Sequence, residues 1–241
     1  MSPAAPSSTR GACTMVTPPG QRPGPRAMMF RDRRDAGRRL GRELVSRGEQ
    51  VSVVCGLLPG GVLVAAEVAD VLAVPLDVIV VRKLGLPARP EMAMGAIGED
   101  GVRLIDAALL RRAGATFGDF AAAERREREV LDRWVEAVRG DHRPRDLIGQ
   151  TVLIVDDGIT SWVTMSAASL VARKRGAARV IAAAPVASLM AVPRITGAAQ
   201  VVCLEQRPHV QAVSACYRDF PQTTASQVYA LLGDRPELTA S

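Results

Sequence analysis

Short apolar runs alternate with longer segments of helical periodicity over most of this chain. The stretch "FRDRRDAGRRLGRELVSRG", from Phe30, places Leu40, Leu44 and Val45 on one face and ends at Gly48, which predicts a helix. Five apolar runs predict buried strands, at 51–58, 76–83, 151–157, 178–187 and 199–206. Further helices are predicted at 60–73, 106–113, 117–139, 164–175 and 223–232, with a short one between the last two strands.

This alternation predicts an α/β fold. Strands that are apolar throughout, with helices between them, are typical of a parallel sheet that is covered on both faces. Ligands of such sheets bind at the carboxyl ends of the strands. We therefore expect the functional residues of this chain to follow its strands.

Three segments depart from the regular pattern. Residues 1–27 are rich in Pro, Gly and Ser, which predicts a disordered tail before a domain at 28–234, and 235–241 is expected to be a C-terminal tail. The stretch "LGLPARPEMAMGAIGEDG" (84–101) is long and contains several Gly and Pro residues. Its composition predicts a flexible loop or lid.

Composition and charge argue against several classes of function. The formal net charge of +6 comes from residues 1–39, where eight arginines face two aspartates, so the remaining chain is neutral and nucleic-acid binding is not expected. The four cysteines form no CxxC pair, which argues against structural zinc and a disulfide framework, and Cys55 and Cys203 are predicted to be buried. No run is long enough to span a membrane and no signal-peptide core is present, so we expect a cytoplasmic protein.

The third predicted strand ends in two adjacent acids, Asp156 and Asp157. Carboxylates at the end of a buried strand need hydroxyl donors or a cation as partners, such as a sugar or Mg²⁺. A turn leads from them into the next predicted helix, and it consists of Gly158, Ile159, Thr160, Ser161, Trp162, Val163 and Thr164. The free N–H groups of a helix start, together with the hydroxyls of Ser161 and Thr164, favour a bound phosphate. The combination predicts a site for a ribose 5-phosphate.

Two other strand ends carry complementary features. Gly60 and Gly61 form a turn between a strand and a helix, which is a second place where backbone N–H groups can bind an anion. Arg82 and Lys83 place positive charge at the end of the neighbouring predicted strand. A sugar-phosphate site, a separate anion-binding turn and a lid together favour a substrate with phosphates at two ends.

The stretch "VLIVDDGITSWVTM" resembles the 5-phosphoribosyl diphosphate (PRPP) signature of the type I phosphoribosyltransferases. The segments "MFRDRRDAGRRL", "PGGVLVAAEVA", "LDVIVVRKLGLPARPEMAMGAI" and "CYRDFPQT" are similar to a bacterial branch of the same family, and the resemblance extends from Met29 to Leu232. It implies a parallel sheet flanked by helices, with a small hood, to which Tyr217, Arg218 and Asp219 could contribute, and a flexible loop.

The resemblance also implies roles for the residues at the strand ends. Asp156 and Asp157 would hold the ribose hydroxyls, with Mg²⁺ bound mainly through PRPP near them. Residues 158–164 would bind the 5-phosphate. Pro59, Gly60, Gly61 and Arg82 would form the pyrophosphate side, with Lys83 as a third catalytic residue. The implied reaction transfers the 5-phosphoribosyl group to a nitrogen nucleophile and releases pyrophosphate, and a homodimer is left open.

Two positions differ from the family pattern. Ser161-Trp162 stands where the family has Thr-Gly, and a side chain there would cost about 1–2 kcal/mol if the backbone has a positive φ. Pro59 replaces an arginine of the related branch, which removes a charge and an N–H donor. Both changes affect predicted phosphate contacts.

Several functions therefore stay open. The chain is either an active PRPP-dependent transferase or a degenerate member that binds a phosphorylated ligand or acts as a regulatory module; a purely structural or partner-binding role is a third alternative. A response-regulator receiver is disfavoured, because the strands after 151–157 offer no aspartate for phosphorylation. The acceptor nucleophile cannot be deduced from these residues.

Overall fold

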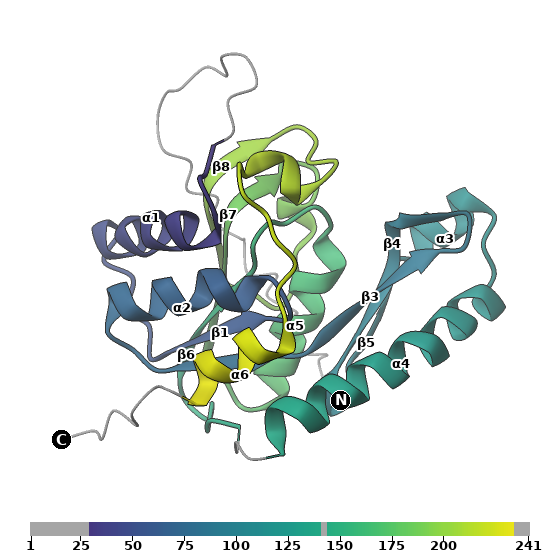
Figure 1. The fold of residues 1–241 in the computed structure, drawn as a ribbon. Helices are drawn as coiled ribbons and strands as arrows, with labels where there is room; N and C mark the ends of the chain where they lie inside the picture. Colours follow the sequence, from purple (N-terminus) through teal and green to yellow (C-terminus); the bar gives the residue numbers. More distant parts are fainter. Residues whose placement is uncertain (1–28, 141–143, 234–241) are drawn as a thin grey trace, which may run out of the picture.

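The computed structural model describes residues 29–140 and 144–233. The tails predicted at 1–27 and 235–241 lie outside these ranges. The described chain contains two sheets, which are separated by a helix (Figure 1). The larger has five strands in the order β2-β1-β6-β7-β8, and all its neighbouring strands are parallel.

The five parallel strands confirm the predicted α/β fold. They are β1 (Val53–Leu57), β2 (Leu76–Ile79), β6 (Thr151–Val155), β7 (Arg179–Ser188) and β8 (Gln200–Arg207). Helices α1 (Arg33–Ser46) and α2 (Gly61–Leu72) cover one face, and α5 (Trp162–Lys174) covers the other (Figure 1). Successive residues of β6 alternate between these layers: Leu153 packs in the core beside α2, and Ile154 packs against α5.

The second sheet corrects two predictions. The strand predicted at 76–83 is divided, so that β2 ends at Ile79 and β3 (Val81–Leu86) begins an antiparallel sheet with β4 (Arg89–Gly98) and β5 (Arg103–Ile105). Most of the segment predicted as a flexible loop at 84–101 is therefore paired as a β3–β4 hairpin. In β3 the buried Leu84 and Leu86 alternate with the exposed Lys83 and the half-buried Gly85, which is typical of a strand with one face towards solvent. The count of Gly and Pro residues obscured this pattern.

Helices cover the antiparallel sheet on both sides. Helix α5 lies between the two sheets, and the long helix α4 (Phe117–Arg139) packs on β3 and β4 from the other side (Figure 1). Helix α4 begins with a capping box between Thr116 and Asp119, and α3 (Ala107–Ala113) is capped by Asp106. Among the described residues, no helix is both long and apolar enough to cross a membrane.

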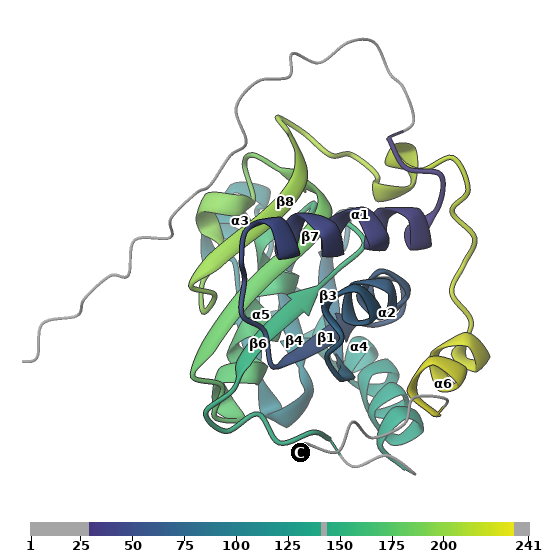
Figure 2. The ribbon, with the colours of Figure 1, turned by 90° about the vertical axis from the view of Figure 1, so that its left-hand side faces the viewer.

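The C-terminal segment returns across the outside of the fold. After β8 it forms a 3₁₀ turn, η3 (Val213–Cys216), passes the start of α1, and ends in α6 (Ala225–Gly233) near α2 (Figure 2). Phe30 and Tyr217 form a parallel bridge there, and their rings lie 5.4 Å apart. The first described residues therefore pair with the segment at Tyr217, above the carboxyl edge of the parallel sheet.

The core is built mainly from Ala, Val, Leu and Ile, and it includes Cys55 and Cys203 as predicted. Burial raises the pKa of Cys203 to about 12, so this thiol stays protonated.

A network of buried ion pairs connects β2, α4 and the end of α5. Arg139 of α4 binds Asp77 of β2 at 2.7 Å and Glu99 at 3.4 Å. Glu99 also accepts from Arg175, at the end of α5, at 2.9 Å.

The buried ion pair of Arg139 and Asp77 is expected to contribute to the stability of the fold. The Arg139→Met substitution would leave the Asp77 carboxylate buried without its counter-charge, so we expect a loss of about 3 kcal/mol in the free energy of unfolding. Urea denaturation measures the loss. The half-buried i,i+4 pair of Arg128 and Glu124 on the surface of α4 supplies a control, since Arg128→Met should cost at most about 0.5 kcal/mol. Equal effects of the two substitutions would contradict a structural role for the network.

Candidate functional site

The two acids predicted as the centre of the site follow the middle strand of the parallel sheet. Asp156 continues the pairing of β6, because its N–H donates to the carbonyl of Ala183. Its Oδ1 atom accepts from the N–H of Asp157 at 2.9 Å, which turns the chain away from the strand. Asp156 Oδ2 and Asp157 Oδ1 have no hydrogen-bond partner among the described residues. Each acid therefore retains one acceptor oxygen.

Asp157 is also bound by an arginine that sequence reasoning missed. Arg33, in the first turn of α1, donates from Nε to Asp157 Oδ2 at 2.8 Å, and both side chains are largely buried. The Arg33 guanidinium stacks on Phe220 at 3.6 Å and donates to the carbonyl of Pro221 at 2.6 Å. Arg33 is one of five arginines between 31 and 39, so the sequence pattern does not distinguish it.

Ionisation of the two carboxyl groups is unfavourable because both are buried and adjacent. Burial, followed by the charge of Asp157, raises the pKa of Asp156 well above its usual range. Burial also raises the pKa of Asp157, although Arg33 opposes this shift. A ligand that donates hydrogen bonds or brings a cation would relieve this cost, and perturbed acids at a strand end are typical of functional sites.

The Gly60-Gly61 turn lies directly against these acids. A Cβ atom on Gly61 would come within 2.8 Å of the carbonyl oxygen of Val155 and within 2.9 Å of Asp156 Oδ1. A Cβ atom on Gly60 would overlap the Asp157 carboxylate. The turn that was predicted as a separate anion site is thus part of the same site, and its glycines are required by close packing. Pro59 precedes this turn and follows Leu58 through a cis peptide bond.

The residues after the acids are held by their neighbours. Ile159 is buried and pairs through its backbone with β7, where its N–H donates to Val186 and its carbonyl accepts from Ser188. The Tyr217 hydroxyl donates to the carbonyl of Asp157 at 2.6 Å, and burial raises its pKa, so this donor keeps its proton. The side chains of Ile159 and Val163 face the core. Only their backbone groups could contact a ligand.

Trp162 does not occupy a strained position. It is the first residue of α5, after the N-cap Ser161, whose Oγ accepts from the N–H of Val163 at 3.4 Å. Among the described residues other than glycine, only Ala73 and Asp100 have a positive φ, so the strain considered for Trp162 is absent.

The Trp162 indole instead takes part in a polar cluster. Its Nε1–H donates to Asp106 Oδ2 at 3.2 Å, and Arg194 donates to the same oxygen at 2.7 Å. The Arg194 guanidinium also lies over the indole ring at 4.6 Å. Burial opposes ionisation of Asp106, but the N–H of Leu109 in the cap of α3, followed by the bonds from Arg194 and Trp162, lowers the pKa of Asp106. Trp162 thus connects the start of α5 to the start of α3.

Two pockets adjoin the start of α5. One of about 380 Å³ is lined by Thr160, Ser161 and Trp162, with Arg112, Arg194 and His209 among its basic residues. The other, of about 390 Å³, is lined by Thr164 and Leu58 together with Arg82, Lys83 and Arg126. The start of α5 therefore faces two pockets, each of which contains cationic side chains.

Arg82 and Lys83 line the second pocket, but not as ends of a parallel strand. Both lie in β3, where Arg82 binds Glu127 of α4 at 2.8 Å and Lys83 is exposed near the carbonyl of Glu91. The pairing with Glu127 reduces the charge that Arg82 can offer a ligand. Lys83 is the freer of the two cations.

The acids fit a divalent cation only in part. Hard carboxylate oxygens suit Mg²⁺, but one oxygen of each acid is already used, by Arg33 or by a backbone N–H. Among residues 29–140 and 144–233, no cluster of three or more His, Cys, Asp or Glu side chains is placed to hold a metal. A cation at this site would need most of its ligands from a bound substrate or water.

The chain is similar in sequence and in structure to known proteins. The family model described as "Phosphoribosyl transferase domain" matches residues 31–218. Proteins of two Mycobacterium tuberculosis strains, provisionally named phosphoribosyl transferases, are 44% identical over 205 residues, which cover 85% of this chain. The chain spans 46% of the length of these relatives. The crystal structure of TT1426 from Thermus thermophilus is 41% identical with a TM-score of 0.69, over 85% of this chain and 98% of that one.

The raised pKa of Asp156 predicts that the stability of the protein depends on pH. The folded-state pKa of Asp156 is raised, so protonation of Asp156 stabilises the folded protein. This stabilisation is fully present below the unfolded-state pKa of about 3.9 and is lost as the pH rises through the folded-state pKa. Asparagine carries no charge and can keep the bond from Asp157 N–H through its Oδ1. We expect Asp156→Asn to be more stable than the wild type at pH 7, with an advantage that shrinks towards pH 4.

Urea unfolding at several pH values measures this difference. Asp132→Asn, at an exposed position of α4, is the matched control and should leave stability unchanged at every pH. A gain that does not depend on pH, or a loss at pH 7, would contradict a raised pKa at Asp156.

Proposed function

Because the chain belongs to the phosphoribosyl transferase domain family, we propose that it binds PRPP with Mg²⁺ and transfers the 5-phosphoribosyl group to a nitrogen nucleophile, with release of pyrophosphate. The observation that carries this proposal is the position of the acids Asp156 and Asp157 between the start of α5 and the Gly60-Gly61 turn. Acceptors for hydroxyls and donors for phosphates are thereby combined in one site.

The ribose would be held by the two acids. Asp156 Oδ2 and Asp157 Oδ1 are acceptors of the kind that the 2′- and 3′-hydroxyls of a ribose require. Hydrogen bonds from hydroxyls to a carboxylate are charge-assisted and contribute about 1.5–3 kcal/mol each. They would also stabilise the ionised forms of the acids and lower their raised pKa values.

The phosphates would occupy the two pockets beside α5. The 5-phosphate suits the pocket at Thr160, Ser161 and Trp162, where the N–H groups of the first turn and the positive end of the helix dipole favour an anion. The pyrophosphate suits the pocket that contains Lys83 and Arg126. The 380 and 390 Å³ of these pockets are ample for the two groups.

The chain would act chiefly by positioning. The bond between C1 of the ribose and the pyrophosphate oxygen breaks, the nitrogen nucleophile forms the new bond to C1, and the nucleophile loses a proton. Asp156 and Asp157 fix the ribose, while Lys83 stabilises charge on the departing group. Mg²⁺ bound to PRPP supplies further neutralisation of the leaving pyrophosphate. No covalent nucleophile of the protein is required, because the positive charge that develops at C1 is shared with the ring oxygen.

A second candidate function is the binding of a phosphorylated ligand without transfer. The buried Arg33–Asp157 pair favours this alternative, because Arg33 occupies one oxygen of an acid that the ribose requires. Pro59 also favours this alternative. It stands where the related branch has an arginine, so the pyrophosphate side carries less positive charge.

Thermal unfolding with PRPP and Mg²⁺ tests whether PRPP binds. A ligand at about 100 times its dissociation constant adds about 2.7 kcal/mol, which corresponds to a rise of roughly 5–10 °C for a chain of this size. In Asp156→Asn an amide donor would replace the free acceptor oxygen, so its PRPP shift should fall by more than half, whereas Asp132→Asn should match the wild type. No shift in the wild type would exclude PRPP as the ligand.

Pyrophosphate release then separates the two candidates. The transferase predicts release from PRPP that depends on an added amine or nucleobase and is lost in Asp156→Asn. Binding of PRPP without acceptor-dependent release across a panel of such nucleophiles would favour the non-catalytic alternative.

A further inference from the structure

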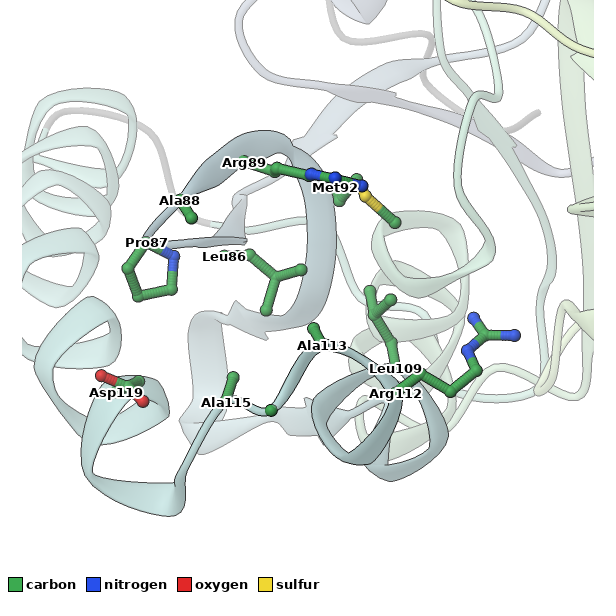
Figure 3. Close-up of a pocket in the computed structure, with 11 residues that line it drawn as sticks. Leu86, Pro87, Ala88, Arg89, Met92, Leu109, Arg112, Ala113, Ala115 and Asp119 are labelled. Carbon is green, nitrogen blue, oxygen red and sulfur yellow. The ribbon is translucent and has the colours of Figure 1, made fainter.

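A third pocket lies away from the two acids, between the tip of the β3–β4 hairpin and helix α3 (Figure 3). Its volume is about 650 Å³, which lies within the range of small-molecule sites. The pocket contains neither the two acids nor residues 158–164 nor Lys83, although it shares Arg112 with the pocket at Thr160–Trp162. We propose that it binds a small amphipathic anion, meaning a flat apolar group that carries one carboxylate or phosphate.

The floor of the pocket is apolar. Leu86 from β3 and Leu109 from α3 form part of it, and both are buried beneath the surface. Ala113 and Ala115 leave open space where larger side chains would fill it, as Figure 3 shows. Small residues beside buried leucines create room for a ring or a short branched chain.

The charges around the pocket favour an anion. Arg89 and Arg112 line it, and neither has an ion-pair or hydrogen-bond partner in the part of the chain that the structure describes. The third charged residue is Asp119, but its carboxylate accepts from Thr116 in the capping box of α4. In Figure 3 the two arginines extend on one side of the pocket and Asp119 lies on the other. The ligand's anionic group would therefore lie at the arginine side, with its apolar part over Leu86.

The pocket is also connected to the proposed phosphate site. Met92, Leu109 and Arg112 line both this pocket and the pocket at Thr160–Trp162. The hairpin that forms its other wall carries Lys83 in β3. A ligand bound here would hold the hairpin against α3, so its occupancy can influence the site without contact with PRPP.

Binding of 2-naphthoate to the full chain without PRPP tests the proposal, with 2-naphthalenemethanol as the neutral probe of the same shape. Calorimetric titration should show tighter binding of the carboxylate than of the alcohol. Arg112→Gln should weaken 2-naphthoate about fivefold and leave the alcohol unchanged, because one charge-assisted contact at an exposed site is lost. Ala113→Trp should weaken both probes at least about tenfold by filling the space.

Matched controls lie on the same helix. Arg111→Gln removes an equal charge and Ala108→Trp adds an equal side chain outside the pocket, and both should bind 2-naphthoate like the wild type. Thermal melting of each variant verifies that it is folded. Equal affinity for the two probes, no binding of 2-naphthoate, or equal weakening by Arg111→Gln would overturn the proposal.

A protein interface at this pocket is the other outcome to be distinguished. Light scattering that finds a dimer which Ala113→Trp dissociates would assign the pocket to a second copy of the chain and would also overturn the proposal. Because the probes are tested without PRPP, these results are independent of whether the chain is a transferase.

Discussion

The close approach of the Gly60-Gly61 turn to Asp156 and Asp157 is the contact on which the site depends. Two neighbouring parallel strands, β1 and β6, end at this point, and each leads into a helix. The absence of side chains at the two glycines lets the start of α2 reach the acids, since a Cβ on Gly61 would lie 2.9 Å from Asp156 Oδ1. The backbone at the start of α2 thereby lies directly against the two carboxylates.

This arrangement is stabilised by segments that are remote in the sequence. Arg33, from the first helix, binds Asp157, and Tyr217, from the C-terminal segment, binds the carbonyl of the same residue. The Arg33–Asp157 pair partly offsets the cost of burying two acids, and the stacking of Arg33 on Phe220 excludes water from it. The site is therefore organised before a ligand arrives, and a ribose would compete with or extend an existing network. Preorganisation of this kind favours binding because few groups must be ordered at the moment of contact.

The sequence predicted much of the sheet and the position of the acids, because continuous apolar strands and their polar ends are local patterns. It did not predict that β2 and β3 belong to different sheets, since Val80 and Val81 extend one apolar run across the boundary. The short strand β5 was missed, because its three residues show too little periodicity. Arg33 and the Trp162–Asp106–Arg194 cluster depend on contacts between residues far apart in the chain. Such contacts leave no spacing signal in a single sequence.

A crystal structure of the protein with PRPP and Mg²⁺ would show whether the two acids and the start of α5 hold this ligand. We expect the ribose hydroxyls at Asp156 and Asp157, with the 5-phosphate at the N–H groups of residues 158–164 and the pyrophosphate towards Lys83. PRPP bound elsewhere, or a site at these acids that stays empty at saturating PRPP while Arg33 keeps its contact with Asp157, would contradict this expectation.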